Sequence, residues 1–179
     1  MTFDEFVAWE PEQEQRHELV AGRVSLMPGV TVAHSRIETS VVATFRAHLR
    51  GGPCDVHGGQ IMLETRTGIR YADAVVTCDE RDRDPGARVL RHPKLIVEVL
   101  SKSSASVDRG AKVDEYCALA SLEQCVVIDS RKRWARTYLR DGDAWLPSLP
   151  ISAGSLQLSS LGLSLDVDEI YDEAGVAPE

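Results

Sequence analysis

The chain has 179 residues, of which 43% are hydrophobic and 27% charged, values typical of an ordinary globular protein. Its length suits one core of sizeable volume, so we expect a single domain over residues 1–179. A formal net charge of −8 argues against a large basic nucleic-acid footprint, although it permits an enzyme that touches DNA locally. No apolar run reaches the length of a membrane span, and the N-terminus lacks a signal-peptide pattern. We therefore expect a cytoplasmic protein with no membrane partner.

The four cysteines show no Cys-x-x-Cys spacing. They are Cys54, Cys78, Cys117 and Cys125. Three of them lie inside apolar strand or helix patterns, which is typical of small buried hydrophobic residues. We therefore expect reduced, mostly buried thiols, and neither a zinc site nor a disulfide framework.

The first predicted element is a short acidic helix over residues 2–14, in which Thr2 and Glu5 have the spacing of a capping box. Two short strands are expected within residues 16–27, around a glycine turn. A longer helix is predicted over residues 33–49. Apolar side chains recur there at every fourth position: Ile37, Val41, Phe45 and Leu49.

The middle and the end of the chain alternate between strand patterns and helix patterns. Strands are expected at residues 54–57, 60–66, 70–78, 94–101, 123–129, 134–139 and 144–149. The charged segment at residues 79–91 is expected to be a solvated loop. Helices are expected at residues 108–121 and around residues 167–172. Helices that flank a mixed sheet indicate an α/β or α+β fold with one core.

Two acids interrupt apolar strands. Asp73 lies in the run from Tyr71 to Cys78, and Glu98 lies in the run from Lys94 to Ser101. The residues around Glu98 are apolar at both parities, which indicates an interior strand. Burying an ionised carboxylate there costs several kcal/mol unless a cation or hydrogen-bond donors compensate. Each acid should therefore have a partner, and either a basic side chain or a divalent metal satisfies this requirement.

The chain resembles the restriction-endonuclease-like PD-(D/E)xK nuclease fold and, within it, the Uma-type family, once catalogued only as a domain of unknown function. The matching stretches are His17–Val24, His34, Tyr71–Val76, Pro93–Ser101, Asp108–Tyr116, Ile128–Asp129 and Leu161–Leu165. They cover nearly the whole chain. The order of Asp73, Glu98 and then a nearby lysine carries most of the resemblance.

This resemblance implies an α/β (α+β), restriction-endonuclease-like fold with a mixed central β-sheet flanked by helices. It also implies hydrolysis of DNA phosphodiester bonds with Mg²⁺ or Mn²⁺ held by Asp73 and Glu98, since hard cations prefer carboxylate oxygens. The superfamily lysine two positions after Glu98 is absent, because Leu100 stands there. The family supplies the lysine from the following helix, which points to Lys112 as the third catalytic residue, with Lys102 as its rival. Ala72 stands where the family has proline.

Further candidates for the site are Glu18, His34 and Gln60. Each also has an ordinary structural interpretation. Glu18 can pair with Arg23, His34 can cap a helix, and Lys112 can be a surface residue. The acidic charge leaves two other functions open, namely a catalytically silent binding or regulatory protein and a structural homodimer with an acidic charge network. A homodimer is expected because Trp134, Trp145 and the apolar residues 146–165 offer much apolar surface.

Overall fold

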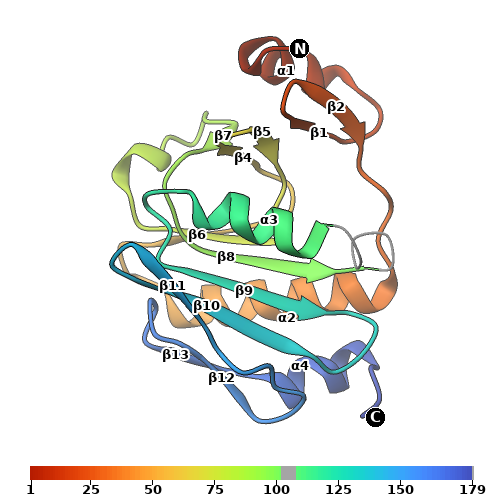
Figure 1. Cartoon of the computed structure of the whole chain (residues 1–179), viewed down its shortest axis with the longest axis vertical. Helices are drawn as coiled ribbons and strands as arrows, with labels where there is room; N and C mark the ends of the chain where they lie inside the picture. The colour runs from red at the N-terminus through yellow and green to blue at the C-terminus, as the bar shows by residue number, and fades with distance from the viewer. Residues whose placement is uncertain (102–107, 179) are drawn as a thin grey trace.

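The computed structural model describes residues 1–101 and 108–178, and its centre is a six-stranded sheet (Figure 1). From one edge to the other, the strands are β11 (Ala144–Pro147), β10 (Ala135–Asp141), β9 (Gln124–Asp129), β8 (Pro93–Leu100), β6 (Ala74–Thr77) and β3 (Asp55–Gly58). β8 pairs with β9 in parallel and with β6 antiparallel, so the sheet is mixed. The predicted fold class, a mixed sheet flanked by helices, is confirmed.

Helices cover both faces of this sheet (Figure 1). One face packs against α2 (Val32–His48) and α4 (Val167–Ala174), and the other packs against α3 (Asp108–Cys117). The hairpin of β12 (Ser155–Leu158) and β13 (Leu163–Asp166) adds buried leucines on the α2 side. Central strand β8 sends Leu95, Val97 and Val99 to the α2 side, and Ile96 and Leu100 to the α3 side. It is therefore the interior strand that the sequence predicts.

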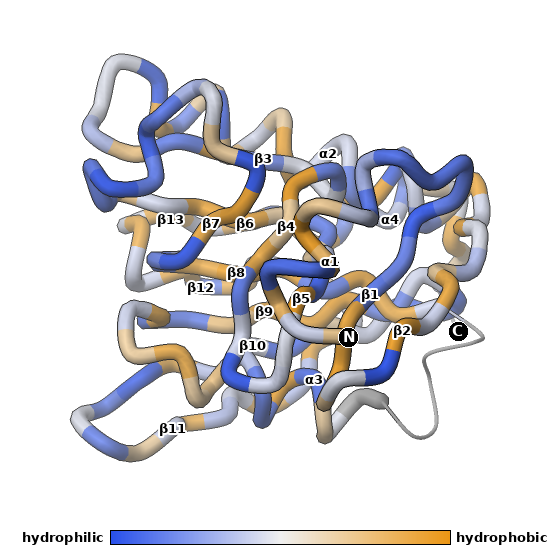
Figure 2. Tube along the Cα trace, turned by 90° about the horizontal axis from the view of Figure 1, so that it is seen from above, coloured by the Kyte–Doolittle hydropathy of each residue, from blue (hydrophilic) through white to orange (hydrophobic). Residues whose placement is uncertain are grey.

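A second sheet lies above α3 and carries the N-terminal segment (Figure 1). Its strands are β2 (Arg23–Leu26), β1 (His17–Val20), β5 (Gly68–Arg70), β4 (Met62–Thr65) and β7 (Val89–Leu90). Helix α1 (Phe3–Trp9), whose Thr2–Glu5 capping box is formed as predicted, continues into a 3₁₀ helix (Glu10–Glu12). Figure 2 shows that the tube is hydrophobic along β4, β6 and β8 and hydrophilic in the peripheral loops.

Two expectations about local structure are wrong. The segment at residues 79–91 is not simply a solvated loop, because it contains a 3₁₀ helix (Glu80–Asp82) and strand β7. Asp82 is buried and accepts hydrogen bonds from the backbone N–H groups of Arg91 and His92, which satisfies its charge inside the fold. Helix α3 ends at Cys117 instead of residue 121.

The expectation that all four cysteines are reduced is also wrong, because Cys54 and Cys78 form a disulfide. The reason is strand pairing. Asp55 of β3 lies opposite Thr77 of β6 in the antiparallel register, so the next residues outward also face each other, with a Cα–Cα separation of 4.0 Å. Cys117 and Cys125 are free thiols, as expected.

The aromatic and apolar residues that suggested a homodimer are largely used within the chain. Trp134 and Trp145 are half-buried against the α3-side core, and Leu156, Leu158 and Leu165 are buried in the α2-side core. Leu146 and Leu149 are exposed, so the homodimer stays a prediction that only these two residues of the set still favour. Among the described residues, no helix is both long and apolar enough to cross a membrane.

Candidate active site

Asp73 and Glu98 reach the same cavity from neighbouring strands. Asp73 directly precedes β6, and the register pairs Ala74 with Val97, so Asp73 lies next to Glu98 along the sheet. The backbone N–H of Val99 donates to Asp73 Oδ2 at 2.6 Å and fixes this arrangement. Both carboxylates line a cavity of about 440 Å³. The sheet register thus places two acids from different strands at one site.

The side chain of Glu98 is buried and doubly hydrogen-bonded. Lys112 Nζ lies 2.7 Å from Glu98 Oε1, and the Tyr116 hydroxyl donates to Glu98 Oε2 at 3.0 Å. Both donors come from α3, one helical turn apart, so they face the same strand. Lys112 also lines the cavity that Asp73 lines. Its ammonium therefore points to the site, as the sequence predicts, and not to solvent.

The network extends from Lys112 to the second sheet. Lys112 Nζ lies 3.4 Å from Glu18 Oε1, and Arg70 donates to the other oxygen of Glu18 at 2.8 Å. Arg70 also donates to Glu115 at 2.7 Å, and Glu115 accepts further hydrogen bonds from two threonine hydroxyls. Glu18 therefore pairs with Lys112 and Arg70, and not with Arg23. This chain of alternating charges connects both sheets through α3.

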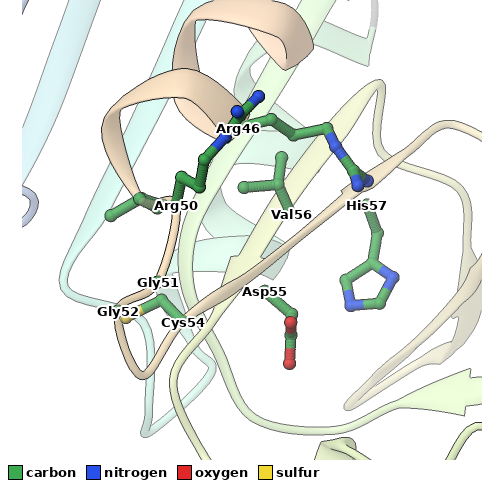
Figure 3. A pocket seen from close by; sticks show the side chains of 9 residues that line it. Arg46, Arg50, Gly51, Gly52, Cys54, Asp55, Val56 and His57 are labelled. Atoms are coloured by element: carbon green, nitrogen blue, oxygen red, sulfur yellow. The ribbon is translucent and has the colours of Figure 1, made fainter.

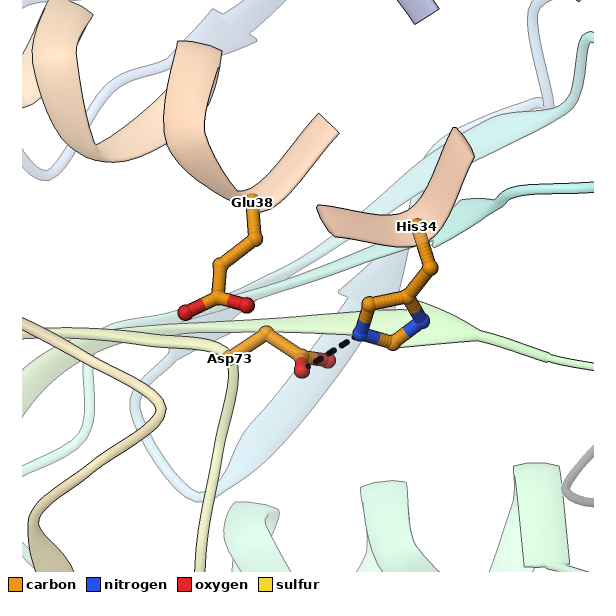
Figure 4. A group of neighbouring side chains, drawn as sticks. All are labelled: His34, Glu38 and Asp73. Carbon is orange, nitrogen blue, oxygen red and sulfur yellow. Dashed lines mark hydrogen bonds and ion pairs between the residues drawn. The ribbon is translucent and has the colours of Figure 1, made fainter. Parts of the chain in front are cut away.

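Helix α2 supplies a second group of side chains at Asp73 (Figure 4). Thr31 caps the first turn of α2 by accepting from the His34 backbone N–H, which orients the helix start. His34 Nε2 donates to Asp73 Oδ1 at 2.9 Å. Glu38, one turn later, also faces Asp73, and single ligand atoms of the three residues lie within 4.8 Å of one another. A cation in this group would contact carboxylates from both α2 and the strand edge.

Asp73 also lines an adjoining cavity of about 380 Å³, which shares Tyr71 and the turn at residues 27–30 with the first cavity. Glu38 and Gln60 line this second cavity. Gln60 is exposed, and its side-chain oxygen accepts a hydrogen bond from Arg16. Gln60 therefore stands beside the site without contacting the acids.

Burial and neighbouring charges shift the titration of the buried groups. Burial raises the pKa of Glu98, and the nearby Asp73 carboxylate raises it further, whereas Lys112 opposes both effects. Burial alone would lower the pKa of Lys112, but the carboxylates of Glu98 and Glu18 outweigh it and hold this pKa above the ordinary value. Lys112 thus stays charged, and the carboxylates around it repel one another.

Comparison with known proteins places the chain in a family. The family model Uma2, described as "Putative restriction endonuclease", matches residues 3–168. The chain belongs to the Uma2 family. An uncharacterized protein of Synechocystis, slr1290, is 33% identical over 171 residues, covering 94% of this chain and 90% of that protein. A second uncharacterized Synechocystis protein, sll1609, is 23% identical over 150 residues, covering 82% and 85%.

The crystal structure of a putative nuclease from Anabaena variabilis has the same fold as this Uma2 chain. It matches with a TM-score of 0.80 at 17% identity and covers 97% of this chain and 99% of that one. The family model, which matches residues 3–168, confirms the predicted resemblance to the Uma-type family.

The structure of this Uma2 chain brings most of the predicted residues together. Glu18, His34, Asp73, Glu98 and Lys112 all line the first cavity. Lys102 lies outside the described residues, so its relation to the site stays open.

Three residues of the site were missed in the sequence. Glu38 has a readable signal, because it stands four residues after His34 and thus on the same helical face. Tyr116 has a similar signal, because it stands four residues after Lys112, whereas Arg70 has none, since it meets Glu18 and Glu115 across elements that are distant in sequence.

Proposed function

We propose that this protein is a metal-dependent endonuclease that hydrolyses DNA phosphodiester bonds. The observation that carries the proposal is the convergence of Asp73, Glu98 and Lys112, from three separate elements, on one cavity. Membership of a family described as putative restriction endonucleases supports the same class of reaction. The carboxylates suit a hard cation, and the lysine suits a substrate that carries negative charge.

The residues present fit a divalent cation held by oxygen. Asp73 and Glu98 line one cavity, and Glu38 approaches Asp73 from the other side. Each carboxylate oxygen has two acceptor positions, so the existing hydrogen bonds leave capacity for a cation. We propose Asp73 and Glu98 as the main ligands and Glu38 as a nearby carboxylate, since the group whose ligand atoms lie within 4.8 Å of one another holds Glu38 and Asp73 but not Glu98. An all-oxygen set of this kind suits Mg²⁺ or Mn²⁺.

His34 fits an orienting role better than a ligand role. A histidine that binds metal usually donates its other ring N–H to an acceptor. Among the described residues, the buried Nδ1 of His34 has no hydrogen-bond partner. The proton of the His34 imidazole is best placed on Nε2, where the Asp73 carboxylate accepts it. This hydrogen bond fixes the direction of the Asp73 carboxylate.

A cation bound at these carboxylates supplies a water of lowered pKa and neutralises charge that develops on the phosphate. The residues of the chain do the rest. Asp73 is held by the Val99 N–H and by His34, and Glu98 is held by Tyr116. Lys112, the one ammonium described in the cavity lining, can donate to the attacking water or to a phosphate oxygen. Glu18 keeps Lys112 on the cavity side.

The alternative is a nuclease fold that binds without turnover. It is favoured by the fact that Glu98 with Lys112, and Asp73 with His34, form satisfied pairs without a metal. Titration with Mn²⁺ separates the two hypotheses. The metal hypothesis predicts binding that Asp73→Asn abolishes and Glu38→Gln weakens at least about tenfold, while the exposed Glu169→Gln serves as the control for lost charge. Absence of Mn²⁺ binding by the parent protein would favour the silent protein.

We further propose that the protein acts as a homodimer, since two sites allow both strands of a duplex to be cut. Support comes from edge strand β2, which exposes Val24 and Leu26 at the end of the second sheet. Light scattering that finds a monomer at micromolar concentration would contradict this proposal.

A further inference from the structure

A second cavity of about 440 Å³ lies at the opposite end of α2, far along the helix from His34 and Asp73. It is formed by the last turns of α2, the glycines after it and the start of β3 (Figure 3). Its polar lining consists of Arg46, Arg50, Asp55 and His57. In Figure 3, Arg46 extends from the helix toward β3, on the side of His57.

The two arginines of this cavity lack acidic partners. Arg46 lies in the last turn of α2 and Arg50 in the turn that follows the helix, and both are exposed. Among the described residues, neither forms an ion pair, and Asp55 instead lies 3.8 Å from Arg83. The chain has a net charge of −8, so two arginines without acidic partners in one cavity give this part of the surface a positive charge that differs from the chain as a whole. Two guanidinium groups in one hollow are suited to a doubly hydrogen-bonded oxyanion.

His57 adds an unused hydrogen-bonding atom to the cavity wall. Its Nε2 is buried, and it has no hydrogen-bond partner among the described residues. A buried polar atom without a partner is unusual in a folded protein and needs an explanation. A rotation of the imidazole that turns Nε2 toward the cavity would make an oxyanion such a partner, because a neutral imidazole can donate from Nε2.

The cavity is connected to the candidate active site by two rigid elements. β3 leads from Asp55 to the Gly59 N–H, which donates to Glu38 Oε1 at 3.1 Å beside Asp73. Four residues of strand span about 13 Å, at about 3.3 Å per residue. The eight residues of helix from Glu38 to Arg46 span about 12 Å, at 1.5 Å per residue. One phosphate group cannot reach both sites over this distance, so the cavity would hold a different phosphate from the one at Asp73.

We propose that the cavity of Arg46, Arg50 and His57 binds one backbone phosphate of the DNA, at a distance from the phosphate that is cut. The identification of DNA as the ligand rests on the proposed function. The affinity for a phosphate group is argued from the cavity alone. A contact of this kind positions the substrate without reading its sequence. The ordinary alternative is that the arginines only complement the C-terminal dipole of α2.

The test compares two double variants that remove the same charge. Arg46→Gln/Arg50→Gln empties the cavity of its cations, and Arg66→Gln/Arg88→Gln removes two other exposed arginines that do not line it. Fluorescence anisotropy measures binding of a labelled duplex in EDTA, where cleavage is suppressed, over a range of salt concentrations. In parallel, thermal unfolding with and without inorganic phosphate measures anion binding without DNA.

We expect the cavity variant to lose its stabilisation by inorganic phosphate and to bind DNA more weakly at all sequences. Its slope of log affinity against log salt should fall by about one unit, the value for one phosphate, and the control should keep the parental slope. Equal slopes in both variants would overturn the inference and leave the nuclease proposal intact. If inorganic phosphate stabilises the parent protein but not the cavity variant, and the parent protein binds no DNA, the cavity binds phosphate but DNA is not its ligand. This result would also overturn the proposed function.

Discussion

Lys112 Nζ and Glu98 Oε1 lie 2.7 Å apart, at side chains that are only 12% and 7% exposed. In the part of the chain that the structure describes, Lys112 is also the one cation that joins Glu98 to Glu18. The pair therefore has two functions in one place, because it compensates a buried carboxylate and also presents an ammonium to the cavity. Its structural contribution can be measured separately from its chemical one.

Glu98→Gln should destabilise the protein in metal-free buffer by about 3–5 kcal/mol, because it leaves Lys112 buried without its main partner. The matched control is Glu123→Gln. Glu123 makes an ion pair of the same length, 2.7 Å, with Lys94, but its side chain is 50% exposed. Removing this surface pair should cost less than about 1 kcal/mol. Urea unfolding measures the loss of unfolding free energy in both variants. Equal losses would show that the pair of Glu98 and Lys112 contributes no more to stability than an exposed ion pair.

His34 can be tested with two substitutions that separate orientation from ligation. His34→Gln keeps a side-chain N–H donor for Asp73, whereas His34→Leu removes it. If His34 orients Asp73, Mn²⁺ affinity should fall about 10–100-fold in the leucine variant and much less in the glutamine variant. Equal losses in both variants would assign His34 as a direct ligand.

His57 should make stability depend on pH. Burial lowers the pKa of His57 in the folded state, and it outweighs the carboxylates of Asp55 and Asp82, which raise this pKa, while the charge of Arg46 lowers it slightly further. The unfolded chain therefore binds a proton near pH 6.5, at a pH where the folded chain does not. The contribution of neutral His57 is complete above about pH 6.5 and is lost as the pH falls toward the lower folded value.

The corresponding variant is His57→Gln, which cannot titrate in this range. Unfolding free energies at about pH 7.5 and about pH 5.5 should differ less in this variant than in the parent protein. His48→Gln, at an exposed histidine of α2, serves as the control and should keep the parental difference. An unchanged pH dependence in His57→Gln would contradict the account.

The disulfide between Cys54 and Cys78 closes a segment with a sequence separation of 24. On a chain-entropy estimate, reduction should lower the unfolding free energy by about 3 kcal/mol. A Cys54→Ser/Cys78→Ser variant should be destabilised similarly and should no longer respond to dithiothreitol. A parent protein whose stability is the same in oxidising and reducing buffer would contradict the presence of this bond in solution.

The residues that the sequence predicts best are those whose environment is local. Asp73 and Glu98 could be identified because each is a lone acid in an apolar strand, and Lys112 because the family supplies its lysine from the helix that follows Glu98. Arg70 and Cys54 could not be placed, since their partners depend on strand register and on the docking of α3. Burial by elements that are distant in sequence also explains why the sequence overstated the apolar surface available to a homodimer. Leu156 and Leu158 look exposed in a late hairpin, but they are buried once β12 packs on the α2 side.

The most direct measurement is cleavage of labelled single-stranded, duplex and branched DNA in Mg²⁺, in Mn²⁺ and in EDTA. The account predicts that the parent protein cuts at least one of these substrates, only with a divalent cation. It predicts that Asp73→Asn and Lys112→Met abolish cleavage while the exposed-site control Glu169→Gln retains it. Cleavage that persists in EDTA or in Asp73→Asn, or a folded, Mn²⁺-binding parent protein that cuts none of the three DNAs, would contradict it.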